Sequence, residues 1–167
     1  ALPSPTPHVM RGGMTRLLFV CTGNICRSPT AEAVARSVAA KRGVVWHVDS
    51  AGTSAWHAGE APDPRAITVA AKRGHDLSSM SSRALSERDF SRFDHLIALD
   101  RAHLHEMRRV PIETVSGRLS LLLDWAPGLE GEDVPDPYYG DDDDFERALD
   151  LIETGVNGLA DALQRKG

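Results

Sequence analysis

Residues 17–29 read LLFVCTGNICRSP, which is an apolar run, then a polar loop, then the start of a helix. The apolar run at 17–20 is typical of a strand buried in a parallel sheet. Ser28 and Pro29 resemble a helix start, with Ser28 as the cap and Pro29 at the first helical position. Residues 30–42 are strong helix formers, and Gly43 is expected to end them. This stretch predicts a strand, a loop and a helix in direct succession.

The same alternation continues along the chain. Strands are expected at 44–48, 95–99 and 114–119, and helices at 64–73, 102–109 and from about 142 onward. The last helix carries one apolar stripe, made of Phe145, Leu149, Ile152, Val156, Leu159 and Leu163. The pattern predicts an α/β fold, a single domain with a four-stranded parallel sheet and helices on both faces. Such sheets bind ligands beyond the carboxyl ends of their strands, so the loop at 21–28 is the first candidate site.

Composition limits the class of protein. The chain has 167 residues and a formal net charge of −5, which suits one soluble domain and argues against nucleic acid as a partner. No apolar run approaches the roughly 18 residues that span a bilayer, so no membrane partner is expected. Two cysteines cannot staple a secreted fold, which favours a reduced, cytoplasmic protein. We expect the domain at 14–167, preceded by a proline-rich segment at 1–13 that is either a disordered tail or an expression remnant.

The loop at 21–28, called the 21–28 loop below, has the composition of an anion site. Gly23 and Asn24 tolerate left-handed backbone geometry, which would turn successive N–H groups inward into a nest. The following helix start adds unpaired N–H groups, and Arg27 offers two parallel donors to a phosphate-like oxyanion. Cys21 would lie at the floor of this nest, where the field that binds an anion also stabilises a thiolate. The pattern predicts a sulfur nucleophile directed at phosphorus.

Two plainer interpretations compete with this one. Cys21 could be a buried free cysteine near a loop arginine, although the filled spacing from Cys21 to Pro29 makes that coincidence improbable. A zinc site is poorly supported, because Cys21 and Cys26 have no neighbouring histidine. We therefore expect no metal.

The residues from Cys21 to Pro29 resemble the active-site loop of the low-molecular-weight protein tyrosine phosphatases. The resemblance runs from Met14 to near the C-terminus and includes DSAGT at 49–53, PDPRA at 62–66 and DPYYG at 136–140. It implies a phosphatase that works through a cysteinyl-phosphate and needs neither a metal nor a cofactor.

The resemblance also implies the roles of individual residues. Cys21 would be the nucleophile, Arg27 would hold the phosphoryl oxygens, and Asp136 would be the general acid and then the general base. Ser28 would donate to the thiolate and Asn24 would fix the loop shape. The phosphate-binding and supporting set is Thr22, Gly23, Asn24, Ile25, Cys26 and Ser28.

The expected substrates are phosphotyrosine-containing proteins. Trp56, Tyr138 and Tyr139 would form aromatic walls that suit a phenyl phosphate and keep short phosphoserine from reaching Cys21; core packing is the alternative for any one of them. Arginine phosphatase is a second candidate, but related protein-arginine phosphatases look to carry Thr where this chain has Ile25, and an apolar Ile25 favours tyrosine. Arsenate reductase is a third, but it needs more than two cysteines. A non-catalytic phosphotyrosine-binding module would lack the nucleophile or the acid.

Three further expectations concern side chains around the site. Cys26 resembles the family's second cysteine, which forms a protective disulfide with the nucleophile, and a small buried side chain is the alternative. Many relatives carry a loop-bracing histidine at about the position of Met80, so the brace would be absent or replaced here, which puts a bracing role for Ser50 in doubt. His57, His103 and His105 are expected to be solvated surface residues. We expect a monomer, with weak self-association left open.

Overall fold

The computed structural model describes residues 14–111, 113 and 115–166. Their secondary structure alternates as the sequence predicts. The strands are β1 (Thr15–Cys21), β2 (Trp46–Gly52), β3 (His95–Ala98) and β4 (Arg118–Leu121). The α-helices are α2 (Arg27–Arg42), α3 (Pro64–Ala71), α4 (Asp89–Arg92), α5 (Arg101–Met107) and α6 (Asp142–Lys166), and a 3₁₀ helix spans Leu122–Trp125. The segment at 1–13 and Thr114 lie outside the described residues.

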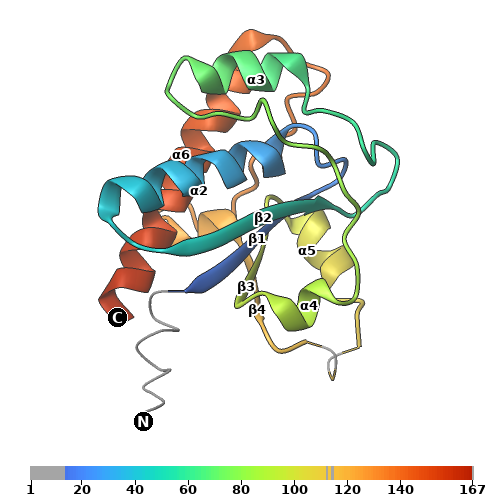
Figure 1. Cartoon of the computed structure of the whole chain (residues 1–167), viewed down its shortest axis with the longest axis vertical. Coiled ribbons are helices and arrows are strands. Elements are labelled where there is room, and N and C mark those ends of the chain that lie inside the picture. The colour runs from blue at the N-terminus through green and yellow to red at the C-terminus, as the bar shows by residue number, and fades with distance from the viewer. Residues whose placement is uncertain (1–13, 112, 114, 167) are drawn as a thin grey trace.

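The four strands form one parallel sheet in the order β2-β1-β3-β4. Helices α2, α3 and α6 cover one face of the sheet, and α4 and α5 cover the other (Figure 1). The predicted α/β architecture is therefore confirmed.

Strand β1 is buried on both faces. Because successive side chains of a strand point to opposite sides, β1 contributes residues to both cores. Leu17 and Phe19 pack in the core under α2 and α6, whereas Leu18 and Val20 pack in the core under α4 and α5. A strand in this position needs apolar residues at every step, which explains the uninterrupted run at 17–20.

The sheet order places the 21–28 loop at a special point. The chain leaves β1 toward β2 on one side, and β3 lies against β1 on the other. Loops that leave the carboxyl ends of the strands diverge there and open a crevice, where ligands of such sheets bind. The fold thus presents the 21–28 loop in the position that the sequence indicates.

Several predicted boundaries differ from the structure. The second strand begins at Trp46 and runs on to Gly52, because its backbone pairs with β1 along the whole of that strand, up to Cys21. The fourth strand begins at Arg118, where pairing with β3 begins. Helix α3 ends at Ala71, before the predicted 73. Long-range pairing and local turns decide these ends, so propensity alone misplaces them.

Helix α6 confirms the predicted apolar stripe. Phe145, Leu149, Ile152, Val156 and Leu159 are buried, and Leu163 is partly buried near the end of the helix. None of the helices in the described part of the chain has a stretch long and apolar enough to cross a bilayer.

Candidate active site

The 21–28 loop connects β1 directly to α2. Asn24 has a φ of 57°, so its predicted left-handed conformation is confirmed. The prediction for Gly23 is wrong, because its φ is not positive. A Cβ at Gly23 would lie 2.9 Å from His57 Cδ2, so glycine serves close approach there. A Cβ on Gly52, at the end of β2, would lie 2.6 Å from the Thr22 carbonyl oxygen, so the loop also needs a glycine beneath it.

Ser28 hydrogen-bonds to the Cys21 sulfur and does not cap the helix. Helix α2 begins at Arg27, and its cap residue, Cys26, makes no side-chain cap bond. The predicted Ser28 cap is therefore wrong, and Pro29 is the third helical residue, where the backbone nitrogen still needs no helical partner. The Ser28 hydroxyl lies 2.9 Å from Cys21 Sγ, and the Ser28 N–H donates to the same sulfur at 3.4 Å.

Asn24 connects this pair to the neighbouring strand. Its Nδ2 donates to Ser28 Oγ at 2.8 Å and to Ser50 Oγ at 3.0 Å. The Ser50 hydroxyl in turn donates to Glu32 Oε1 at 2.6 Å. Burial raises the pKa of Glu32, although the bond from Ser50 and the charge of Arg36 oppose that shift. Ser50 therefore takes part in bracing the loop, a role that the sequence left in doubt.

The brace sought near Met80 comes from the next residues along the chain. Met80 is partly buried and packs against the core. The Ser82 hydroxyl donates to the Gly23 carbonyl at 2.9 Å, and the Arg83 N–H donates to Asn24 Oδ1 at 2.9 Å. A serine and a backbone amide therefore hold the loop from this side.

Arg27 is buried and fixed along one edge. Its Nη1 donates to Asp100 Oδ2 and to the Val134 carbonyl, each at 2.8 Å. Its Nη2 lies 3.7 Å from Asp136 Oδ2. Because Nη1 is bound by two acceptors, Nη2 is the nitrogen left to face Asp136.

His103 is only 3% exposed, so the prediction that it is a surface histidine is wrong. Its Nε2 lies 2.7 Å from Thr22 Oγ1 and 3.5 Å from Arg27 Nη2. Its Nδ1 lies 3.0 Å from Asp100 Oδ1, in an orientation that makes no hydrogen bond. Burial lowers the pKa of His103 to about 4, the charge of Arg27 adds to the fall, and Asp100 opposes it. A neutral ring whose Nε2 accepts the Thr22 hydroxyl proton fits this environment.

The other two histidines differ from each other. His105 is exposed, as predicted. His57 is partly buried against the 21–28 loop, and its Nδ1 lies 2.9 Å from Glu60 Oε1. Its side chain keeps 26% of its surface exposed, so His57 is a surface histidine that also contacts the loop.

A cavity of about 320 Å³ lies over the 21–28 loop and brings the predicted site residues together. Its lining comprises Cys21, Thr22, Gly23, Ile25, Cys26, Arg27, Ser54, Trp56, His57, Asp136, Tyr138 and Tyr139. Asn24 and Ser28 are buried and act from behind the lining. Sequence reasoning missed Ser54 and His57 as lining residues, and it missed the supporting pair Asp100 and His103. The place of Asp100, two residues after the end of β3, was the available signal, because that strand ends beside β1.

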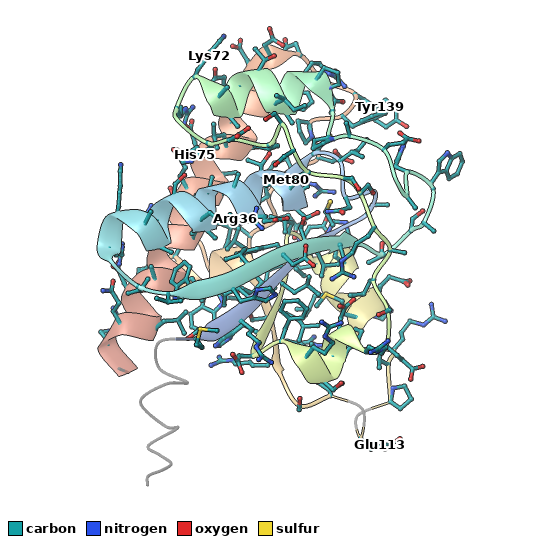
Figure 2. All side chains as sticks on the ribbon, viewed as in Figure 1. Arg36, Lys72, His75, Met80, Glu113 and Tyr139 are labelled. Atoms are coloured by element: carbon teal, nitrogen blue, oxygen red, sulfur yellow. The ribbon has the colours of Figure 1, made fainter. Side chains whose placement is uncertain are left out.

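The aromatic walls stand in solvent. Trp56 is 85% exposed and Tyr139 is 93% exposed, so neither is a core residue. Tyr138 is partly buried, and its ring meets that of Tyr139 edge to face at 4.9 Å between centroids. Figure 2 shows Tyr139 at the outer surface, beside the beginning of α3. These rings can contact a ligand without rearrangement of the core.

Cys26 is buried beside a carboxylate. Its Sγ lies 3.9 Å from Asp63 Oδ2, and both it and Cys21 are free thiols. Burial, and then the negative charge of Asp63, raise the pKa of the Cys26 thiol strongly. Cys26 therefore stays protonated at neutral pH.

Comparison with known proteins identifies the fold and the loop together. The family model described as low molecular weight phosphotyrosine protein phosphatase matches residues 16–167. The chain belongs to this family. The low molecular weight protein-tyrosine-phosphatase of Streptomyces coelicolor is 45% identical over 156 residues, which cover 90% of this chain and 94% of that protein.

Solved structures of the phosphatase family also match this chain. YfkJ of Bacillus subtilis superposes with a TM-score of 0.85 at 38% identity and covers 93% of this chain and 98% of its own. A protein tyrosine phosphatase of Entamoeba histolytica, crystallised with Hepes in its active site, has a TM-score of 0.85 at 35% identity, covering 91% and 98%. This low molecular weight phosphatase therefore shares its fold with these relatives over most of the chain.

Proposed function

We propose that this phosphatase hydrolyses phosphotyrosine and other aryl phosphates through a cysteinyl-phosphate on Cys21. The observation that carries the proposal is the common cavity. The Cys21 sulfur, the Arg27 guanidinium and the Asp136 carboxylate line it, and two exposed aromatic rings flank it. An oxyanion bound there meets a buried cation and the amides of the 21–28 loop, so no metal is needed to supply positive charge. Hepes in the Entamoeba relative is a sulfonate, which supports oxyanion binding at such a site.

In the first step, the Cys21 thiolate attacks phosphorus. The S–P bond forms as the bond from phosphorus to the aryl oxygen breaks, and Asp136 donates its proton to the departing phenolate. Asp136 is 49% exposed and lies 3.7 Å from Arg27 Nη2, so it can reach a substrate oxygen held by that arginine. Thr22 to Cys26 supply the loop amides, and Asn24 fixes the loop.

In the second step, Asp136 takes a proton from water, whose oxygen attacks phosphorus. The S–P bond breaks, phosphate leaves, and the Cys21 thiolate is restored. Ser28 supports this departure, because its hydroxyl lies 2.9 Å from the sulfur that recovers its negative charge. A hydrogen bond to a charged group contributes about 1.5–3 kcal/mol, so this contact can accelerate the step measurably.

The aromatic rings support tyrosine as the substrate residue. A phenyl ring between Trp56 and the pair Tyr138 and Tyr139 gains stacking that a serine side chain cannot provide. Ile25 is buried at the cavity and offers no polar group to a phosphorylated guanidinium. Arsenate reduction needs further cysteines, and the chain has two. Two cysteines are too few to staple a secreted fold, which supports a reducing, cytoplasmic setting.

Hydrolysis of p-nitrophenyl phosphate with and without EDTA tests the proposal. We expect EDTA to leave the rate unchanged and Cys21→Ser to abolish turnover. Asp136→Ala should lose a factor on the order of 10²–10⁴ in kcat, the usual contribution of a positioned acid or base, because the water of the second step needs its base even when the leaving group is nitrophenolate. Activity that survives Cys21→Ser, or that disappears with EDTA, would contradict the mechanism. Phosphotyrosine, phosphoserine and phosphoarginine peptides then test the substrate class, and faster phosphoarginine hydrolysis would reassign it.

A further inference from the structure

Arg65, the second residue of α3, forms a closed ion pair with Asp63. Asp63 Oδ1 accepts from the Arg65 N–H at 2.9 Å and from Nε at 3.1 Å, and Oδ2 accepts from Nη2 at 2.8 Å. The hydrogen bonds from Arg65 lower the pKa of Asp63 against the effect of burial, so the carboxylate is ionised at neutral pH. Asp63 is also the N-cap of α3. The backbone of α3 therefore fixes the position of the Asp63 carboxylate, and the carboxylate fixes the Arg65 guanidinium.

The guanidinium also binds the loop that carries the proposed acid, residues 136–140. Arg65 Nη2 donates to the Tyr138 carbonyl at 2.9 Å, and Nη1 donates to the Gly140 carbonyl at 3.3 Å. Asp136 Oδ1 accepts from the Tyr138 N–H at 3.1 Å. Tyr138 is thus held by its carbonyl to Arg65 and by its amide to the Asp136 side chain.

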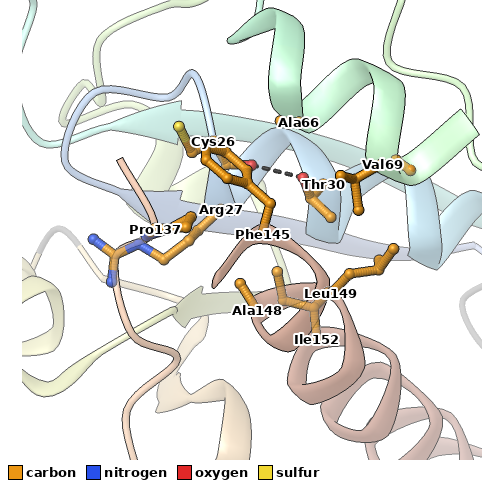
Figure 3. Close-up of a pocket in the computed structure, with 11 residues that line it drawn as sticks. Cys26, Arg27, Thr30, Ala66, Val69, Pro137, Phe145, Ala148, Leu149 and Ile152 are labelled. Atoms are coloured by element: carbon orange, nitrogen blue, oxygen red, sulfur yellow. Dashed lines mark hydrogen bonds between the residues drawn. The ribbon is translucent and has the colours of Figure 1, made fainter. Parts of the chain in front are cut away.

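Aromatic packing fixes the plane of the guanidinium. Arg65 Cζ lies 4.6 Å from the ring centroid of Phe145 and 5.7 Å from that of Tyr138. Phe145 in turn lines a cavity of only about 10 Å³ together with Pro137 and Cys26 (Figure 3). There is little room for the 136–140 loop to shift while Arg65 and Phe145 stay in place.

The same ion pair is attached to the 21–28 loop. The Asp63 N–H donates to the Ile25 carbonyl at 2.8 Å, and Cys26 Sγ lies 3.9 Å from Asp63 Oδ2. The two residues therefore bridge the loop that holds Cys21 and the loop that holds Asp136, and no step of the chemistry described above uses them.

We propose that Arg65, held by Asp63, is a positioning residue that keeps the Asp136 carboxyl within reach of the leaving oxygen. The inference rests on the proposed role of Asp136. Proton transfer needs heavy atoms within about 2.6–3.2 Å. Asp136 itself is half exposed, and its carboxylate accepts from the Tyr138 N–H, whose residue Arg65 holds by its carbonyl. A misplacement of about 1 Å can cost on the order of 10²-fold in rate. The bridge matters most where the leaving group depends on protonation.

Arg65→Ala and Arg65→Lys test the inference with two substrates, p-nitrophenyl phosphate and phenyl phosphate. Nitrophenolate leaves readily without a proton, whereas phenolate requires one. We expect kcat/KM to fall roughly 10–100-fold on phenyl phosphate and only a few-fold on p-nitrophenyl phosphate. Lysine should not restore the rate, because an ammonium cannot form the planar bidentate pair. Should Arg65→Ala fail to fold, Arg65→Lys decides the question.

Arg73→Ala is the matched control. Arg73 follows α3 and binds Glu146, Asp150 and Glu153 of α6, but these contacts reach neither loop. It should lower the melting temperature and leave the ratio of the two kcat/KM values unchanged. Equal losses on both substrates for the Arg65 variants, or none, would overturn the inference. Asp136→Asn separates the two proposals, because an unchanged ratio in that variant would overturn the acid role itself.

Discussion

The Ser28 hydroxyl and the Cys21 sulfur lie 2.9 Å apart, and the remaining contact of that hydroxyl directs its proton toward the sulfur. Asn24 Nδ2 donates to Ser28 Oγ at 2.8 Å, which occupies a lone pair of the oxygen and leaves the hydrogen free. The sulfur thus receives a hydrogen bond from Ser28 that is strongest when it carries a full negative charge. That charge returns when the cysteinyl-phosphate breaks down.

Ser28→Ala should therefore slow the second step more than the first. We expect kcat to fall about 10–100-fold, the equivalent of one hydrogen bond to a charged group, and a burst of phenol to precede a slow steady state. Rapid-quench measurement of product against time checks this. Ser37→Ala is the control, because Ser37 lies in the same helix but bonds to His75 and to the Ala33 carbonyl. A Ser28→Ala enzyme without a burst and with unchanged kcat would contradict the assignment.

The buried His103 should make folding pH-dependent. In the folded protein the pKa of His103 is about 4, below the ordinary value of about 6.5. Between these two pH values the unfolded chain binds a proton at His103 that the folded protein does not bind. The contribution of His103 to the free energy of unfolding is therefore complete above about pH 6.5. It is lost as the pH falls toward 4, by an amount on the order of 2–3 kcal/mol. Urea unfolding at pH 7 and pH 4.5 measures the loss.

His103→Gln should remove most of this loss, because an amide does not titrate in that range while its oxygen can still accept from Thr22. His105→Gln, two residues along the same helix and exposed, should behave as the wild type. The same difference between the two pH values in all three proteins would show that His103 is not buried in its neutral form.

Cys26 is predicted to protect Cys21 from irreversible oxidation. Peroxide converts the Cys21 thiolate to a sulfenic acid, and attack by Cys26 forms a disulfide and releases water. Burial and Asp63 raise the pKa of the Cys26 thiol, so the disulfide should form faster as the pH rises. After peroxide treatment, dithiothreitol should restore wild-type activity but not that of Cys26→Ala. Equal recovery of the two proteins would exclude the protective role.

Trp56 should contribute to substrate binding and hardly to stability. Because its side chain is 85% exposed, Trp56→Ala should leave the melting temperature unchanged. Aromatic contact provides about 0.5–1.5 kcal/mol, so KM for phosphotyrosine peptides should rise roughly 2–10-fold with little change in kcat. Trp46→Ala is the opposite control, because Trp46 packs against the core and its loss should lower the melting temperature at constant KM. A destabilised Trp56→Ala protein would point to a structural role.

Local sequence determined the central elements. The run from Leu17 to Val20 is apolar at every position, which is typical of a strand covered on both faces, and the stripe on α6 has the period of a helix with one buried side. Asn24 was predictable as a left-handed residue, because few side chains tolerate that backbone. Each of these features depends on the residue and its near neighbours. Resemblance to a family then gave roles to Cys21, Arg27 and Asp136.

Only the tertiary structure decided which side chains support the site. Ser28 has the residue type of a helix cap, yet its hydroxyl contacts the Cys21 sulfur. The 21–28 loop turns back on itself and brings the end of β1 next to the first turn of α2. The sequence predicts His103 to be a surface histidine. In the structure, β3 places Asp100 and α5 beside Arg27, so that His103 is buried there. Arg65 reaches the 136–140 loop across more than seventy positions. Such contacts join segments distant in sequence, and neither period nor propensity encodes the geometry at which parallel strands bring their loops together.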